Sequence, residues 1–165
     1  YNKNFKKKFL MYDGNDIETI RSILKENKSI AVVGLSANWN RPSFFASKYM
    51  QQKGYKIIPV NPRYSEILGE KCYKSLIDIE EKVDIVDCFR KSDDILPIAT
   101  DAIKIKAKVL WMQLSVFNED AANLSRNAGL KVVQDRCVKI EHARLFGGLN
   151  WVGVNTKIIS AKKIS

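Results

Sequence analysis

Short apolar segments alternate along this chain with longer stretches whose apolar residues recur at helical spacing. Strands separated by helices cannot pair as hairpins, because the chain must cross the sheet before the next strand begins. Such crossovers are right-handed and leave the strands parallel. The alternation predicts an α/β fold, a Rossmann-like doubly wound sheet that is mainly parallel, with about five strands and helices on both faces. The expected strands are 30–33, 55–60, 83–89, 109–114 and 130–133, and the expected helices are 16–27, 43–53, 93–106 and 118–128.

Residues that start or stop helices stand at the ends of these helical stretches. Asp16 opens the first, Gly54 follows the second, and Asn118 precedes the last. Asp and Asn accept hydrogen bonds from the free amides of a first turn, and Gly adopts the backbone conformation that ends many helices. The segment 63–79 has neither periodicity and is expected to be a loop.

The size and composition suit one domain. The chain has 165 residues, of which 45% are hydrophobic. A domain of this size buries about 70% of the surface of its unfolded chain. No apolar run approaches the roughly 18 residues of a membrane span, and residues 9–12 are too short for the apolar part of a signal peptide. We therefore expect a cytoplasmic protein.

The cysteine pattern argues against a fold that disulfides or a zinc ion stabilise. Cys72, Cys88 and Cys137 are odd in number and lack C-x-x-C spacing, so neither a disulfide framework nor a structural zinc site is indicated. We expect reduced thiols and no metal.

Most of the net charge of +10 lies at the two ends of the chain. Residues 1–10 hold four lysines and residues 151–165 hold three, with no acidic residue in either segment. This predicts a basic N-terminal extension over 1–15, a folded domain over 16–145 and a basic C-terminal tail over 146–165. Nucleic-acid binding through the tails is the less favoured alternative, because terminal charge runs are commonly solvated.

The first strand is followed by a loop with the residues of a phosphate site. Gly34 ends the strand, and Ser36 and Arg41 precede a helix that starts near Pro42. Amides at a helix N-terminus lack intrahelical partners and the helix dipole is positive there, so phosphates bind at such positions. Ligands of doubly wound sheets bind beyond the carboxyl ends of the strands. The residues there are Gly34, Leu35, Ser36, Arg41, Asn61, Pro62, Arg63, Phe89, Arg90, Gln113 and Ser115.

Two features disfavour NAD as the ligand. The loop lacks G-x-G-x-x-G, and the acidic residue expected about 20 residues beyond it to bind the ribose is missing. Asn61, Pro62 and Arg63 stand there instead. An adenosine with an additional phosphate fits these residues better, which leaves an NADP-dependent oxidoreductase or another nucleotide-dependent enzyme as the alternative function.

A series of motifs runs in a characteristic order between about residues 16 and 145. They are AVVGLS at 31–36, RPS at 41–43, IPVNP at 58–62, LGEK at 68–71, VDIVD at 83–87, FR at 89–90, LWMQL at 110–114 and DRC at 135–137. In these motifs the chain resembles the small CoA-binding proteins of bacteria and archaea, single-domain relatives of the CoA-binding domain in the α subunit of succinyl-CoA synthetase. The resemblance implies a Rossmann-like fold that holds coenzyme A by its adenine, 3′-phosphate and diphosphate.

The resemblance also implies roles for individual residues. Gly34, Leu35, Ser36 and Arg41 would meet the diphosphate, Asn61, Pro62 and Arg63 would border the adenosine, and Phe89, Arg90 and Gln113 would complete the site. Ser115 and Val138 depart from the family, which usually has glycine and proline there. A side chain at 115 would narrow the path of the pantetheine arm.

Each of these residues also has a purely structural interpretation. Ser36 would cap the next helix, Arg41 would be a solvated surface residue, Asn61 with Pro62 would form a strand-ending turn, and Phe89 would belong to the core.

Cys137 lies close in sequence to Asp135, Glu141 and His142, which suggests a nucleophile. We instead expect a small buried thiol, because a free cysteine more often packs as a hydrophobe. The sequence therefore predicts non-catalytic binding of coenzyme A or an acyl-CoA, with a protein partner or a second copy of the chain as further partners, and no catalytic residue.

Overall fold

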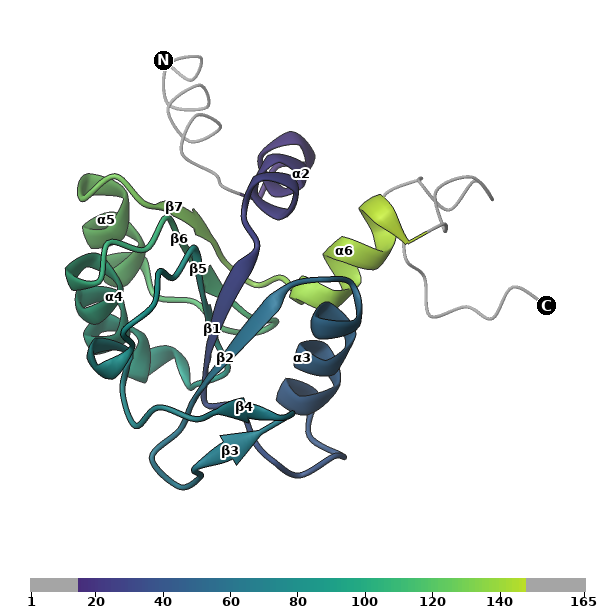
Figure 1. The fold of residues 1–165 in the computed structure, drawn as a ribbon. Helices are drawn as coiled ribbons and strands as arrows, with labels where there is room; N and C mark the ends of the chain where they lie inside the picture. Colours follow the sequence, from purple (N-terminus) through teal and green to yellow (C-terminus); the bar gives the residue numbers. More distant parts are fainter. Residues whose placement is uncertain (1–14, 148–165) are drawn as a thin grey trace, which may run out of the picture.

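In the computed structural model, which describes residues 15–147, five parallel strands form the central sheet (Figure 1). Their order is β2-β1-β5-β6-β7, and every neighbouring pair is parallel. The order reverses between β1 and β5, so a crevice is expected beyond their carboxyl ends. The predicted fold is confirmed. The strands are β1 (Ser29–Val33), β2 (Lys56–Val60), β5 (Ile85–Cys88), β6 (Val109–Met112) and β7 (Lys131–Val133).

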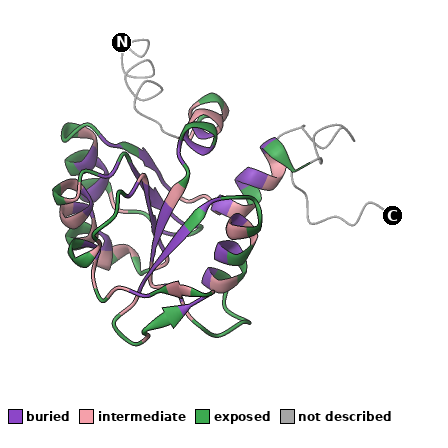
Figure 2. Cartoon of the chain, viewed as in Figure 1, coloured by how far each residue is buried: buried purple, intermediate pink, exposed green. Residues whose placement is uncertain are grey.

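Helices cover both faces of the sheet (Figure 1). One face packs against α2 (Ile17–Glu26), α3 (Pro42–Gln52) and α6 (Val138–Phe146). The other packs against α4 (Ile95–Lys104) and α5 (Glu119–Asn127). Because the sheet is covered twice, its strands are buried on both sides and read as continuous apolar runs (Figure 2).

Side-chain caps begin two of the helices where the sequence predicts them. The Asp16 carboxylate accepts a hydrogen bond from the Thr19 amide at 2.8 Å, and the Asn118 side chain accepts one from Ala121 at 2.9 Å. α3 is different, since its N-cap residue Arg41 makes no side-chain cap bond. Pro42 has no N–H group and the Phe44 amide donates to the Arg41 carbonyl at 3.0 Å, so among the first three residues of α3 only Ser43 has an amide without a partner in the described part of the chain.

Two local predictions differ from the structure, and one helix was not predicted. The segment 63–79 contains the antiparallel pair β3 (Glu66–Ile67) and β4 (Glu70–Lys71), whose strands are too short to show alternation. The helix expected over 93–106 begins as a 3-10 turn at Ser92–Asp94, and α4 starts at Ile95. α6 was not predicted at all.

The predicted basic extension over 1–15 and tail over 146–165 lie almost entirely outside the described residues. Among the helices that are described, none combines the length and the apolar character needed to cross a membrane.

Candidate functional site

Gly34 lies where β1 approaches the end of β5 most closely. Its φ is +87°, and a Cβ atom at this position would stand 2.4 Å from the carbonyl oxygen of Phe89 and 3.0 Å from Cδ of Arg90. Only glycine fits this conformation and this space. The close approach also places Arg90, from the loop after β5, beside the β1–α3 loop.

The β1–α3 loop is held by its own polar side chains. The Ser36 amide donates to Ser43 Oγ at 3.1 Å, and Ser36 Oγ accepts from the Asn38 amide at 3.1 Å. Ser36 therefore does not cap α3. The Asn38 side chain accepts from the Asn40 amide at 3.4 Å. The polar side chains of the loop therefore fix its shape. The Ser36 amide already donates a hydrogen bond within the loop.

Asn61 joins the loop after β2 to the loop after β1. Its Nδ2 donates to the Leu35 carbonyl at 3.0 Å, and its Oδ1 accepts from the Arg63 amide at 2.9 Å. The Leu35 side chain is fully buried, so only its main chain lies near the crevice. Pro62 and Arg63 are exposed beside it.

Three guanidinium groups come from three loops at this edge. Arg41, Arg63 and Arg90 are all exposed. Arg90 lies 3.2 Å from Asp94, whereas neither Arg41 nor Arg63 forms an ion pair with any other described residue. Phe89 is partly buried and packs against the core, which matches its structural interpretation.

Gln113 directly follows β6 at the carboxyl edge of the sheet. It is buried, and its Nε2 donates to Asp87 Oδ1 at 2.5 Å. Burial raises the pKa of Asp87 to about 7, although the Gln113 hydrogen bond lowers it. Asp87 was not among the predicted site residues. Its only signal was a carboxylate inside an otherwise apolar strand.

Hydrogen bonds join β6 and the loop after it to the loop after β7. Ser115 and Asp135 both have positive φ, 68° and 56°, and the Ser115 amide donates to Asp135 Oδ1 at 2.7 Å. Indole Nε1 of Trp111 donates to the Arg136 carbonyl at 2.8 Å. Ser115 therefore adopts a conformation that glycine adopts more easily.

Cys137 is the N-cap residue of α6 and is only partly buried, so the prediction of a buried thiol is wrong. Burial still raises the pKa of its thiol, against backbone hydrogen bonds that lower it. His142 Nδ1 lies 3.0 Å from the Tyr49 hydroxyl, and the ring also packs against Tyr55. In the described residues, no hydrogen bond joins Cys137 to His142, and no group of acidic, His and Cys side chains is suited to a metal ion.

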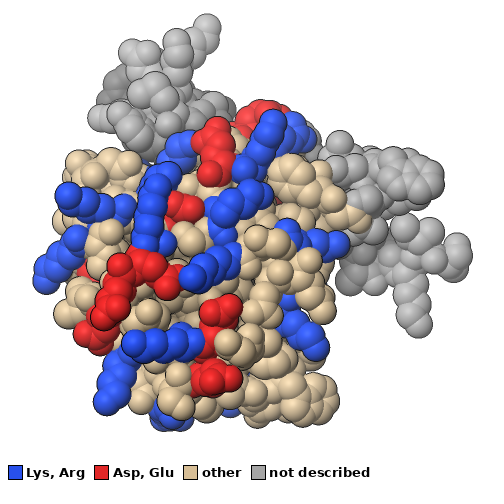
Figure 3. Space-filling view, viewed as in Figure 1, with Lys and Arg blue, Asp and Glu red and all other residues tan. Residues whose placement is uncertain are grey.

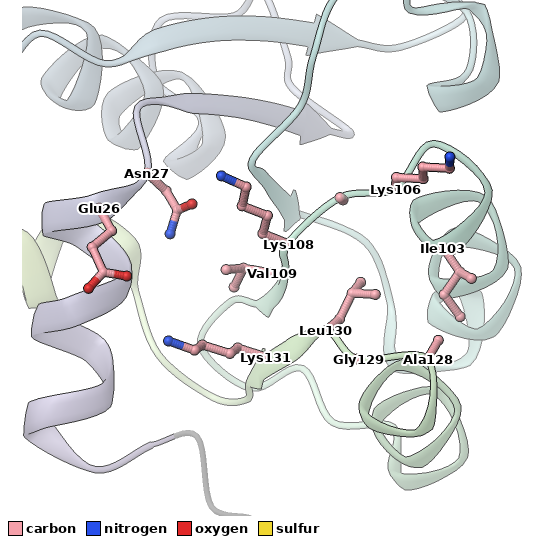
Figure 4. Close-up of a pocket in the computed structure, with 11 residues that line it drawn as sticks. Glu26, Asn27, Ile103, Lys106, Lys108, Val109, Ala128, Gly129, Leu130 and Lys131 are labelled. Atoms are coloured by element: carbon pink, nitrogen blue, oxygen red, sulfur yellow. The ribbon is translucent and has the colours of Figure 1, made fainter.

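A cavity of about 390 Å³ lies at the opposite, amino edge of the sheet (Figure 4). Lys106, Lys108 and Lys131 line it together with Glu26. The last turns of α2, α4 and α5 lie beside these residues, and helix C-termini carry partial negative charge that lysines offset. We therefore do not assign the phosphate site to this cavity.

The charges on the visible face of the molecule alternate in sign. Lys and Arg side chains are interleaved with Asp and Glu side chains across it (Figure 3). A nucleic-acid surface needs a patch of one sign. This face offers none.

Comparison with known proteins places the chain among CoA-binding sequences. The family profile described as "CoA binding domain" matches residues 28–143. The uncharacterized protein YneT of Bacillus subtilis is 43% identical over 124 residues, covering 75% of this chain and 92% of YneT. A solved structure of a hypothetical protein from Pyrococcus horikoshii is 43% identical, with a TM-score of 0.78, and the match covers 81% of this chain and 94% of that one.

A shorter match is to an enzyme. The ADP-forming acetate–CoA ligase of Methanocaldococcus jannaschii is 40% identical over 58 residues, which are 35% of this chain and 8% of the ligase.

Proposed function

Because the chain belongs to the family of CoA binding domains, we propose that it binds coenzyme A or an acyl-CoA at the carboxyl edge of its sheet without transforming it. The observation that carries the proposal is the family match over 28–143. This match spans β1 to β7 and the loop after β7, and so includes all five loops at the carboxyl edge.

In this proposal the diphosphate lies at the open N-terminus of α3. Gly34 and Ser36 would shape the loop, since their amides already donate to the Val60 carbonyl and to Ser43 Oγ. The Leu35 amide would meet the diphosphate, and Arg41 would supply a positive charge. The absence of a side-chain cap on α3 supports this placement, because a capping side chain would compete with a phosphate oxygen for the same amides.

The two ends of the ligand would extend in opposite directions from the diphosphate. Asn61, Pro62 and Arg63 would border the adenosine with its 3′-phosphate, since they follow β2 on one side of β1. Phe89 and Arg90 follow β5 on the other side and would border the pantetheine arm. Gln113 is buried, so it would contribute by supporting the floor of the site.

A binding role without chemistry is supported by the state of the one candidate nucleophile. The raised pKa of the Cys137 thiol disfavours the reactive thiolate at neutral pH. His142, which would have to act as its base, is engaged by the Tyr49 hydroxyl. We place this role in the cytoplasm, where free thiols stay reduced, and propose that the protein acts as a carrier or sensor with a protein partner or as a homo-oligomer.

The test is thermal denaturation with coenzyme A, acetyl-CoA, NADPH and NAD, together with native mass spectrometry of the purified protein. A ligand that binds only the folded state raises the melting temperature by mass action. We expect CoA or acetyl-CoA to raise it and NAD to leave it unchanged. Stabilisation by NADPH equal to that by CoA would favour the oxidoreductase alternative, since Arg63 suits an extra phosphate in either ligand. No stabilisation by any CoA species would refute the proposal.

A further inference from the structure

Trp39 is the most exposed of the large apolar residues that the structure describes. It is 70% exposed, at the tip of the β1–α3 loop. The Arg41 amide donates to the Asn38 carbonyl at 3.1 Å, so Trp39 occupies the first corner of a tight turn. Almost any residue is accepted at such a corner. The turn therefore does not require an indole.

The loop presents this indole in a defined place. Four hydrogen bonds within 36–43 hold the backbone on both sides of Trp39. The loop would therefore lose little conformational entropy when a ligand covers the ring. By contrast, Trp111 is fully buried in the sheet and is not available to a ligand.

The neighbouring loop lacks an available aromatic ring of its own. Asn61 ties the loop after β2 to the Leu35 carbonyl at 3.0 Å, so the two loops run together. Tyr64, the aromatic residue of that second loop, packs against the core. Arg63 is exposed there and bears a charge suited to a phosphate. Together the two loops thus carry one well-exposed aromatic ring, Trp39, and two exposed cations, Arg41 and Arg63.

We propose that the indole of Trp39 stacks on the adenine ring of bound coenzyme A and so makes the 36–41 loop the element that holds the base. This inference rests on the proposed binding of coenzyme A. Adenine has a flat π face that an aromatic side chain covers well, and loss of one such stack weakens binding about tenfold or more. The Trp39 side chain would then contact the adenosine half of the ligand and make no contact with the pantetheine arm.

The experiment is calorimetric titration of the full chain and of Trp39→Ala and Trp39→Phe. The ligands are coenzyme A and its two halves, adenosine 3′,5′-bisphosphate and 4′-phosphopantetheine. We expect Trp39→Ala to weaken coenzyme A and the bisphosphate about tenfold and to leave 4′-phosphopantetheine unchanged. Trp39→Phe should retain most of the affinity. Phe146→Ala is the control, an exposed aromatic residue at the far end of α6 that should not alter any of the three affinities.

Each outcome is decisive. If the unaltered protein binds coenzyme A and Trp39→Ala binds it equally well, the stacking proposal is wrong while the proposed function stands. If Trp39→Ala weakens 4′-phosphopantetheine as much as coenzyme A, Trp39 contacts the other half and the adenine assignment is overturned. If the unaltered protein does not bind coenzyme A, both proposals fail.

Discussion

At the carboxyl edge of the sheet, Arg41 and Arg63 have no ion-pair partner in the described part of the chain. At the amino edge, Lys56 lies 2.9 Å from Glu81, and Lys108 lies 3.6 Å from Asp84. Helix polarity adds to this difference, because α3 directs its open N-terminus to the first edge whereas α2, α4 and α5 end at the second. The comparison teaches that the number of cations does not identify an anion site. Helix direction separates the two edges better than pairing does, because Arg90 at the carboxyl edge is paired with Asp94 while Lys131 at the amino edge has no ion-pair partner in the described part of the chain.

The two glycines Gly34 and Gly129 provide the largest expected contrast between the edges. Both have positive φ, but a Cβ at Gly34 would stand 2.4 Å from a backbone oxygen, whereas a Cβ at Gly129 would meet nothing within 4 Å. We expect Gly34→Ala to lower the free energy of unfolding by about 3 kcal/mol and Gly129→Ala by about 1 kcal/mol. Urea denaturation measures both. Equal losses of stability in the two variants would show that the nearby Phe89 carbonyl does not destabilise Gly34→Ala.

The carboxylates before and near the end of β5 should respond to pH in opposite ways. Burial raises the pKa of Asp87 from 3.8 to about 7, so the unfolded chain loses this proton first and stability falls as the pH rises through that interval. Asp87→Asn removes the penalty and still accepts the Gln113 hydrogen bond. We expect it to be more stable than the unaltered protein by about 2 kcal/mol at pH 8, with a smaller difference at pH 4.

Asp84 is the control for that prediction, at the amino edge. Burial alone raises its pKa, but hydrogen bonds from the Lys28 and Ser29 amides and the charge of Lys108 bring it below 3.8. Its stabilisation is therefore present at neutral pH and is lost as the pH falls through the folded-state pKa. Asp84→Asn should cost about 1 kcal/mol at pH 7 and less in acid. The same pH trend in both variants would contradict the assignment.

Arg41 and Lys131 compare an unpaired cation at each edge. We expect Arg41→Ala to weaken coenzyme A about tenfold, because a charged hydrogen bond contributes about 1.5 kcal/mol or more. Lys131→Ala, beside the amino-edge cavity, should leave this affinity unchanged. Titration calorimetry at two salt concentrations measures both. A larger loss of affinity in Lys131→Ala would indicate that coenzyme A binds at the amino edge and would contradict the proposal.

The smallest expected effect concerns strained turns. Ser115 at the carboxyl edge and Lys106 at the amino edge have φ values of 68° and 58°. Replacing either by glycine relieves the strain while increasing the entropy of the unfolded chain, so we expect a gain of about 0.5 kcal/mol in each. Chemical denaturation can resolve it. A loss of stability in Ser115→Gly alone would mean that the serine side chain itself stabilises the contact between this loop and Asp135.

The places of the predicted site residues followed from the alternating pattern, because these residues come directly after strands. Gly34, Arg41 and Arg63 lie in the loops after β1 and β2, and their binding roles stay predictions. Leu35 and Gln113 have buried side chains, which their positions alone did not reveal. The exposure of Trp39 was not predicted, because neither periodicity nor spacing tells whether a loop residue points to solvent.

The sequence by itself determined the strands, most of the helices and their parallel order, since burial on both faces and helix capping act within short segments. Only the tertiary structure decided which of these residues touch. Position 34 requires glycine because the carbonyl oxygen of Phe89 lies where a Cβ atom would stand. The pKa of Asp87 depends in part on the hydrogen bond from the side chain of Gln113. Such contacts join segments far apart in the chain, and local patterns carry no information about their distances.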